Sequence, residues 1–344
     1  MTTTSADCAS CADERAAGAA FCEACGRPLA GQTPCPNCGF PGGVGADGYC
    51  ERCGMLAGRP RDHIEADGGE IAAAVTDRGK RHHRNEDAMW LALRGADIDV
   101  VVCDGVSASF DPDVASETAA TTAGALLALD PDVAKAITTA KDAVAELAKS
   151  GDPRRLSSNP ACTIVAATVR GTEINVGWLG DSRAYWLPAE GPAEQLTEDD
   201  SWATHAISMG ADPQAAMRDP KAHAITAWLG ADAGPVVPRV GAFTVVGPGH
   251  LILCSDGLWN YLTDPAEFAA VVRERLHAGG TLIDVARGLT EFANAAGGAD
   301  NITVAVVPVT NAPVAVVPVA TAPVAVVPVA TAPVAEMPTA EIKE

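Results

Sequence analysis

Several apolar segments of this chain end in an acidic residue, and another begins just after one; the residues are Asp104, Asp181, Asp256 and Asp300. Strands that lie side by side bring their ends to one edge, where this many carboxylates repel each other unless cations neutralise them. Oxygen ligands favour Mg²⁺ or Mn²⁺ over zinc. Two such ions can hold a shared water, lower its pKa and orient it for in-line attack on a phosphoryl group.

A basic segment leads into two further carboxylates. Residues 78–87 read Arg-Gly-Lys-Arg-His-His-Arg-Asn-Glu-Asp and end on Glu86 and Asp87. Lys and Arg attract phosphate, so this order suits an anion that is drawn toward a metal-binding acid pair. Taken alone, such a run of charges is typical of a solvated turn between strands. The strand-end acids favour the metal-site interpretation.

The amino-terminal block is rich in cysteine. Eight of the 11 cysteines form four Cys-x2-Cys pairs, and a glycine follows three of the pairs, as tight metal knuckles often require. The pattern predicts two structural tetrathiolate zinc sites rather than a disulfide framework or a redox-active pair. The simplest pairing has one site at Cys8, Cys11, Cys22 and Cys25 and another at Cys35, Cys38, Cys50 and Cys53. An interleaved pairing stays open.

Composition restricts the function classes. Closed four-cysteine sites leave no open metal position, so we expect the block to bind a partner protein or to position the next domain. The formal charge of −20 argues against a general nucleic-acid binder, which needs a positive footprint. No secretory signal is apparent, and no apolar run reaches the about 18 residues of a membrane span. We therefore expect a cytoplasmic protein with reduced thiols.

Periodicity and turn residues predict the elements that must position these side chains. Strands are expected at 71–76, 88–93, 98–103, 162–170, 173–179, 183–187, 224–229, 236–246, 250–255 and 302–307. Helices are expected at 111–129, 131–149, 201–209, from 264 onward and at 281–296, with Asp130 and Pro131 starting the second.

The predicted domain order is zinc ribbons at 1–58, a linker at 59–69, a large domain at 70–309 and a tail at 310–344. Prolines recur every five residues from Pro308 to Pro338 in an Ala/Val/Thr background, which predicts an extended, disordered tail. A spacer, an unselected expansion and a docking peptide all stay open as roles for it.

Residues 70–309 resemble the metal-dependent PPM (type 2C) serine/threonine protein phosphatases, and the cysteine block resembles tandem zinc ribbons. Six motifs carry the resemblance in order and spacing: Asn85-Glu86-Asp87-Ala88, Val102-Cys103-Asp104-Gly105-Val106, Gly180-Asp181-Ser182-Arg183, Leu196-Thr197-Glu198-Asp199-Asp200-Ser201, Cys254-Ser255-Asp256-Gly257 and Asp300-Asn301-Ile302-Thr303. The resemblance implies an α+β fold, a four-layer α-β-β-α sandwich of two mainly antiparallel sheets.

The resemblance also implies roles for the acids. Asp104 would bridge two Mn²⁺ or Mg²⁺ ions, with Glu86 and the Gly105 carbonyl completing one site. Asp256 and Asp300 would complete the other, Asp87 would orient metal-bound water, and Asp181 matches a weaker third-metal ligand.

Three positions depart from the family pattern. His82, with Arg81 and Arg84 beside it, stands where many members have a phosphate-binding Arg. Val106 replaces a proposed general-acid His, and Asn260 replaces a third-metal acid. We expect a Mg/Mn-dependent hydrolase that acts on phosphoserine and phosphothreonine in a phosphoprotein substrate and so opposes a Ser/Thr kinase. The alternatives are a phosphatase-like regulatory module that binds phosphoproteins without turnover and, against the acidity, a nucleic-acid-binding ribbon protein.

Overall fold

The chain divides into two compact units, Met1–Ile64 and Glu65–Glu344. The computed structural model describes residues 35, 38, 40, 49, 50, 52–55 and 58–310. The first four cysteines and the Pro-rich tail lie outside the described residues, so the predictions made for them stay predictions. In the part of the chain that is described, no helix is long and apolar enough to cross a membrane.

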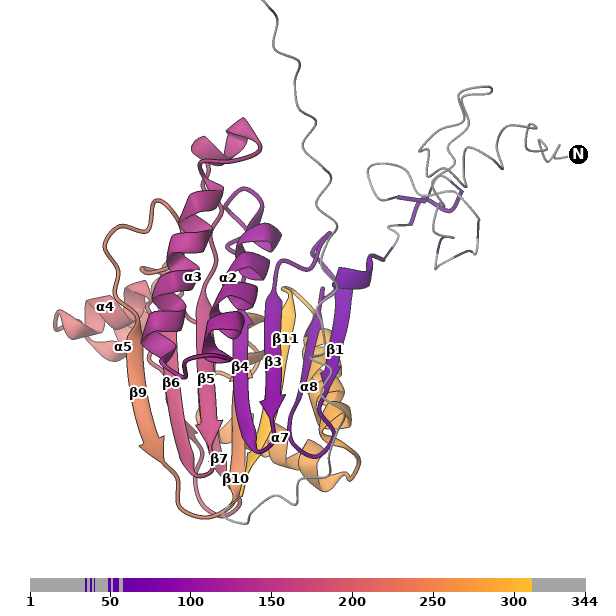
Figure 1. The fold of residues 1–344 in the computed structure, drawn as a ribbon, viewed down its shortest axis with the longest axis vertical. Coiled ribbons are helices and arrows are strands. Elements are labelled where there is room, and N and C mark those ends of the chain that lie inside the picture. The colour runs from indigo at the N-terminus through magenta and orange to yellow at the C-terminus, as the bar shows by residue number, and fades with distance from the viewer. Residues whose placement is uncertain are drawn as a thin grey trace, which may run out of the picture. The chain divides into compact units, whose positions relative to one another are not determined.

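Two antiparallel sheets form the centre of the second unit (Figure 1). The six-stranded sheet has the order β1 (His63–Asp67), β2 (Ala73–Asp77), β11 (Ile302–Val309), β10 (Gly249–Cys254), β7 (Arg183–Pro188) and β8 (Glu194–Gln195). The five-stranded sheet has the order β3 (Ala88–Arg94), β4 (Asp97–Cys103), β5 (Ile164–Arg170), β6 (Glu173–Leu179) and β9 (Arg239–Thr244).

A helix pair covers the outer face of each sheet. Helices α2 (Pro112–Leu127) and α3 (Val133–Leu147) pack on the five-stranded sheet, as Figure 1 shows. Helices α7 (Pro265–His277) and α8 (Leu282–Ala296) pack on the six-stranded sheet. The expected four-layer α-β-β-α sandwich is confirmed.

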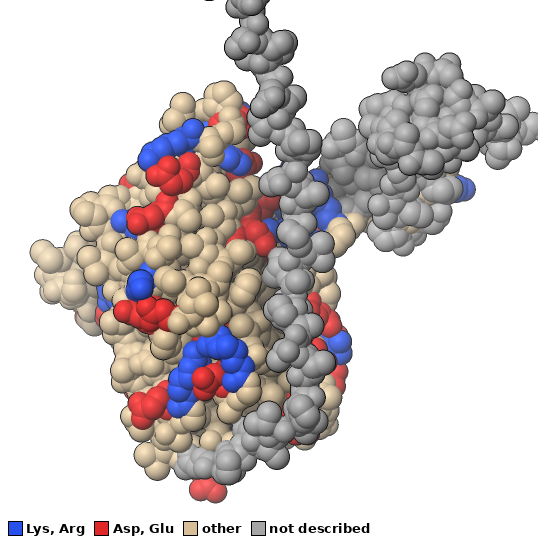
Figure 2. All heavy atoms as spheres, in the orientation of Figure 1, with Lys and Arg blue, Asp and Glu red and all other residues tan. Residues whose placement is uncertain are grey.

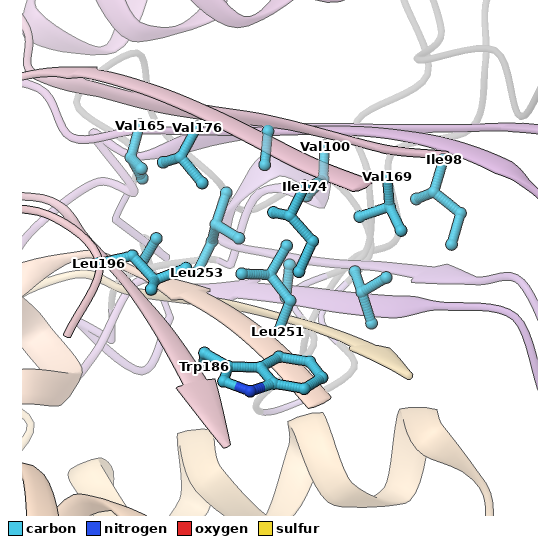
Figure 3. Close-up of a cluster of buried hydrophobic side chains, with 14 of the residues drawn as sticks. Ile98, Val100, Val165, Val169, Ile174, Val176, Trp186, Leu196, Leu251 and Leu253 are labelled. Carbon is cyan, nitrogen blue, oxygen red and sulfur yellow. The ribbon is translucent and has the colours of Figure 1, made fainter. Parts of the chain in front are cut away.

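Aliphatic side chains of alternate strand residues fill the space between the sheets. Figure 3 shows this core, in which Val100, Val165 and Val176 of one sheet face Leu251 and Leu253 of the other. Small residues let helix α2 approach the sheet closely. A Cβ atom added at Gly124 of α2 would collide with the ring of Trp90 in β3. The abundant Ala and Val of the sequence therefore build tight layers, because small side chains permit close approach.

Two segments differ from the sequence predictions. Residues 224–229, expected as a strand, make only the isolated bridges of Ile225 with Ser201 and of Leu229 with Cys162. A short apolar run cannot by itself distinguish a strand from a buried loop. The segment 59–69, expected as a linker, holds the 3-10 turn η1 (Pro60–Asp62) and the edge strand β1. Strand β1 was not predicted because its charged residues, which are typical of edge strands, leave it without a clear apolar pattern.

One helix start also differs, and two short helices were not predicted. The cap of α3 is Asp132, whose carboxylate accepts a hydrogen bond from the Lys135 backbone N–H at 3.0 Å, rather than Asp130. Helix α4 (Trp202–Ser208) is confirmed, while α5 (Pro213–Met217) and α6 (Asp256–Trp259) were not predicted. Both of the unpredicted helices are too short for a periodic apolar pattern.

Candidate active site and cysteine cluster

The strand-end acids come from both sheets. Asp104 follows β4, and Asp181 lies in the turn between β6 and β7. Asp256 opens α6 immediately after β10, and Asp300 precedes β11. Glu86 and Asp87 precede β3. The structure thus brings together all six acids that were predicted to hold or serve the metal ions, and neighbouring carboxylates raise the pKa values of four of them, Asp87, Asp104, Asp181 and Asp256.

Glycine permits the close backbone contacts that hold this edge together. A Cβ atom at Gly105 would lie 2.6 Å from the Glu86 carbonyl oxygen and 2.7 Å from that of Pro112. A Cβ atom at Gly257 would collide with the carbonyl of Asn301. These two positions therefore require glycine, because the strand ends that carry the acids touch there through their backbones.

Asp87 is buried and held by hydroxyl groups. Its Oδ2 accepts hydrogen bonds from Ser255 Oγ at 2.8 Å and from Thr303 Oγ1 at 2.7 Å. Burial raises the pKa of Asp87 to about 7 despite these two hydrogen bonds, and the charges of Asp300 and Asp256 add to the rise. The side chain is oriented rigidly and can exchange a proton near neutral pH.

The remaining buried acids resist ionisation in the same way. Burial raises the pKa of Asp104, and neighbouring carboxylates, first that of Asp87, raise it further. Burial and the charge of Asp256 raise the pKa of Asp181. Burial and the charge of Asp300 raise the pKa of Asp256 to about 6. Such a cluster is unfavourable as four bare anions and suits divalent cations.

The carboxylate of Asp256 has one buried oxygen that a cation could contact. Asp256 Oδ2 accepts a hydrogen bond from Asn260 Nδ2 at 3.0 Å, whereas the buried Oδ1 atom has no hydrogen-bond partner within the described chain. An anionic oxygen left in this state is costly unless a cation contacts it. The amide of Asn260 thus holds the Asp256 carboxylate in place instead of providing another acid.

The acids are spread more widely than ligands of a single ion. Among the described residues, the one group of three or more ligand side chains whose donor atoms all lie within 4.8 Å of one another is a cysteine cluster. A centre with two ions distributes its carboxylates over a larger space than a one-ion site. The ligand atoms that these acids offer are all oxygens, which suit hard divalent cations rather than zinc.

His82 links two of the acids. Its Nδ1 lies 3.6 Å from Glu86 Oε2, and its Nε2 lies 3.1 Å from Asp300 Oδ1. The contact with Glu86 raises the pKa of His82 against an opposing effect of burial. Burial of Glu86 is outweighed by hydrogen bonds from His82 and Ser107, so the pKa of Glu86 is lowered. His82 therefore touches the acid cluster directly, at both Glu86 and Asp300.

Asn301 was not singled out from the sequence as a site residue, yet it shapes the site. Its Nδ2 donates to the carbonyl oxygens of Arg78 at 2.7 Å and Arg84 at 2.9 Å, and its Oδ1 accepts from the Glu86 N–H at 2.8 Å. Ser255 and Thr303, which bind Asp87, also escaped prediction. All three lie beside strand-end acids within the quoted motifs, and that proximity was the available signal.

A cleft adjoins the acid cluster. It has a volume of about 620 Å³ and lies between residues 81–84, which carry Arg81, and residues 107–113. Glu86 lines it as well. Two wall residues are constrained: Arg155 Nε donates to Asp111 Oδ2 at 3.0 Å, and the guanidinium of Arg154 lies 4.5 Å from the Phe110 ring centroid.

Asp181 and Asp256 are connected through a buried aromatic and cationic pair. Arg183 makes two hydrogen bonds to Asp199, at 2.9 and 2.7 Å, and its guanidinium lies 3.5 Å from the centroid of the Trp259 ring. Trp259, in the helix that Asp256 opens, donates from Nε1 to the Asp181 carbonyl at 2.9 Å. This network holds two acid-bearing segments together.

Four described cysteines of the first unit form a compact cluster. The sulfurs of Cys35 and Cys53 lie 3.7 Å apart, as do those of Cys38 and Cys50. A tetrahedral zinc ion with Zn–S distances of about 2.3 Å separates its sulfurs by about 3.8 Å. Gly54 has φ +67°, as expected for a knuckle glycine. The cluster fits one zinc ion, and its members are those of the simplest predicted pairing.

The fold and the carboxylate cluster together define a phosphate-cleaving hydrolase that depends on divalent metal ions. Residues 76–292 match the family described as protein phosphatase 2C, and the chain belongs to this family. It is a metal-dependent serine/threonine phosphatase by class.

Three relatives illustrate the relationship. The serine/threonine phosphatase stp of Listeria innocua is 29% identical over 245 residues, which cover 67% of this chain and 93% of that protein. The PPM Ser-Thr phosphatase MsPP of Mycobacterium smegmatis, solved with cacodylate, is 30% identical with a TM-score of 0.56, over 71% of this chain and all of that one. The catalytic domain of PstP, solved with 2 manganese ions, shares the fold at 23% identity and a TM-score of 0.53, over 72% of this chain and 99% of that one.

Proposed function

We propose that this chain hydrolyses phosphoserine and phosphothreonine in phosphoproteins by using two Mn²⁺ or Mg²⁺ ions. Asp104 would bridge the ions, Glu86 and the Gly105 carbonyl would bind one, and Asp256 and Asp300 would bind the other. The observation that carries this assignment is the buried Asp256 Oδ1 atom without a partner in the described chain, set among acids whose pKa values are raised. Asp181 would serve a weaker third ion.

Side chains of the protein would orient the attacking water, accept its proton and attract the phosphate. Bound ions would neutralise the phosphoryl oxygens and lower the pKa of a shared water. Asp87, fixed by Ser255 and Thr303, would orient that water and accept its proton, for which a pKa of about 7 is suited. His82 would hold Glu86 and Asp300 in position and would attract the transferred phosphate.

We propose further that the cysteine block binds two zinc ions, one of them at Cys35, Cys38, Cys50 and Cys53, and that it serves as a protein-binding module. The S···S distances of 3.7 Å support the site at these four residues. Opposition to a Ser/Thr kinase and a cytoplasmic location complete the proposal. The formal charge of −20 does not suit binding to nucleic acid or to anionic lipid surfaces.

A metal titration of phosphate release from a phosphothreonine peptide tests the proposal. Activity should be absent in chelator, return with Mn²⁺ or Mg²⁺ and be lost in Asp104→Asn, while the exposed Glu190→Gln serves as the matched control. Turnover that persists without metal, or in Asp104→Asn, would refute the mechanism. Phosphopeptide binding without any release, over several metals and pH values, would instead support a regulatory module.

A further inference from the structure

The cleft beside the acid cluster is continuous with the site of chemistry. Glu86 and Ser107 both line it, and Ser107 Oγ donates to Glu86 Oε2 at 2.7 Å. A phosphorylated side chain that reaches the acids from this side would therefore place its neighbouring peptide residues in the cleft. Its volume of about 620 Å³ lies in the range of ligand pockets, so it can hold side chains from such a segment.

One acidic residue of the cleft wall, Asp111, is paired with an arginine, and a second, Asp113, faces Arg84 at longer range. Asp111 Oδ2 lies 3.0 Å from Arg155 Nε, and Asp113 Oδ2 lies 3.9 Å from Arg84 Nη1. The backbone of Asp111 has φ 53° and ψ 51°, a left-handed conformation that is rare for a residue other than glycine. Such a conformation persists where surrounding contacts enforce it, here the pairing with Arg155 and the start of α2 at Pro112. The negative charge of Asp111 is thereby kept on Arg155.

Two arginines that line the cleft, Arg81 and Arg84, are accessible to a ligand. Arg81 is exposed, and its guanidinium has no ion pair within the described part of the chain. Arg84 is 51% exposed and meets Asp113 only at 3.9 Å, which is longer than a hydrogen bond. On the face that carries α2 and α3, by contrast, Lys and Arg lie beside Asp and Glu in small mixed clusters (Figure 2). Accessible arginines are conspicuous in a chain with a formal charge of −20.

We propose that this cleft, the Arg81 cleft, binds the substrate residues next to the phosphorylated side chain and selects an anionic group there. Arg81 and Arg84 would be the specificity-determining residues, because a guanidinium binds carboxylate and phosphate through paired N–H groups. The anionic group is either an Asp or Glu side chain or a second phosphate. The inference rests on the proposed phosphatase function and names the substrate class for that activity.

Peptides that differ only beside the phosphothreonine test this selection on the full-length Mn²⁺-loaded protein. Four peptides carry Ala, Lys, Glu or phosphoserine at the flanking positions, and kcat/KM is measured for each at low and high salt. The Glu peptide should exceed the Ala peptide by about fivefold at low salt, a free-energy difference of about 1 kcal/mol. The preference should shrink at high salt because exposed charges are screened. A further gain for phosphoserine over Glu would identify a second phosphate as the preferred group.

Variants assign the preference to its residues. Arg81→Gln and Arg84→Gln should each lower the Glu-to-Ala ratio toward one, whereas Lys149→Gln, which removes an exposed cation of the Glu146 pair, should keep the parent ratio. p-Nitrophenyl phosphate, which has no flanking residues, separates the roles. If Arg81→Gln lowers its turnover as much as that of every peptide, Arg81 binds the transferred phosphate and the flanking role is overturned.

Different results would contradict the selection of flanking residues and the phosphatase activity itself. Metal-dependent turnover with equal kcat/KM for all four peptides would overturn the inference and leave the phosphatase assignment intact. No turnover of any peptide or of p-nitrophenyl phosphate would overturn the assignment itself. Melting temperatures within about 2 °C of the parent would show that a variant is folded, since about 1 kcal/mol shifts the midpoint of a domain this size by about 2–4 °C.

Discussion

The backbone N–H of Glu86 donates to the side-chain oxygen of Asn301 at 2.8 Å, which joins the start of β3 to the start of β11. The side-chain NH₂ group of Asn301 donates to the carbonyl oxygens of Arg78 and Arg84. Asn301 is 2% exposed, so these hydrogen bonds are shielded from water. One buried side chain thus closes the basic segment and places Glu86 beside Asp300.

Replacing Asn301 with alanine should therefore weaken metal binding and catalysis more than folding. The change leaves the Glu86 N–H and two carbonyls without partners, and a misplacement of about 1 Å at a reacting centre can lower the rate about 100-fold. We expect kcat/KM to fall by about that factor and half-maximal activation to need about tenfold more Mn²⁺.

Asn175→Ala is the matched control, because the Asn175 amide makes only a 3.5 Å contact with Thr168. Mn²⁺ binding measured by calorimetry separates loss of metal from loss of turnover. Unchanged Mn²⁺ affinity and unchanged kcat/KM in Asn301→Ala would show that the hydrogen bonds of Asn301 with residues 78–86 are not needed for metal binding or catalysis.

Asp256→Asn should abolish activity while it stabilises the metal-free protein. Burial and the charge of Asp300 raise the pKa of Asp256 to about 6, so its ionised form opposes folding at neutral pH. An amide of similar size removes that charge. We expect a higher melting temperature in chelator, no further rise with Mn²⁺ and no phosphate release. A melting temperature that still rises with Mn²⁺ as in the parent would place the ions elsewhere.

The metal-free protein should lose stability as the pH rises from about 4 to about 7. Burial raises the pKa of Asp87 from 3.8 to about 7, so the folded state holds a proton that the unfolded state releases over this interval. Stability falls wherever the native state binds more protons, by at most about 1.4 kcal/mol per pH unit for each such group. Thermal unfolding across pH 4–8 with chelator measures the slope.

Mn²⁺ should flatten this dependence, because cations stabilise the ionised carboxylates. Asp87→Asn should reduce the slope, and Glu190→Gln, which is exposed, should not. Stability that rises with pH over the same interval in chelator would contradict the raised pKa.

The sequence predicted that these acids lie together at strand ends, because the chemistry expected of them fixes both their type and their place. Asp104 and Asp256 each precede a glycine at the end of an apolar run, and each lies at the acid cluster. Most strands and long helices were also predicted, because the spacing of their apolar residues reflects which side chains are buried. The strand β1 escaped, because an edge strand with charged residues has little apolar pattern to record.

The site features that the sequence did not predict depend on contacts between segments that are distant in the chain. Nothing local to Ser255 or Thr303 states that their hydroxyls meet Asp87, 168 and 216 residues away in the chain. The same holds for the strained backbone of Asp111, which depends on Arg155. Such roles follow from the register of β10 and β11 and from loop packing, which single-sequence patterns do not encode.

Cys35→Ser should reduce the zinc content of the purified protein by one ion per chain. The Cys35 and Cys53 sulfurs lie at the 3.7 Å expected of two ligands of one tetrahedral ion, and one missing thiolate opens that site. Metal analysis should give two zinc ions for the parent and one for the variant. The Mn²⁺-dependent phosphatase activity of both should be similar, since these metals are structural. Equal zinc content in parent and variant would show that Cys35 is not a ligand.

Arg183→Lys should weaken metal binding through Trp259, even though it keeps the positive charge. The guanidinium of Arg183 binds Asp199 through two nitrogens and lies 3.5 Å from the centroid of the Trp259 ring, and lysine can reproduce neither geometry. Trp259 donates to the Asp181 carbonyl and belongs to the helix that Asp256 opens. A shifted ring would therefore move two acid-bearing segments at once.

We expect Arg183→Lys to raise the Mn²⁺ dissociation constant about tenfold, as loss of a partner behind metal ligands commonly does, with a smaller effect on kcat at saturating Mn²⁺. Arg287→Lys is the matched control, because Arg287 binds Glu65 through two nitrogens, at 2.8 and 2.6 Å, in an exposed position. A purely structural role would lower the melting temperature and leave Mn²⁺ affinity, measured by calorimetry, at the parent value. That result would separate Arg183 from the metal centre, because only a change in the positions of Asp181 and Asp256 links this arginine to the ions.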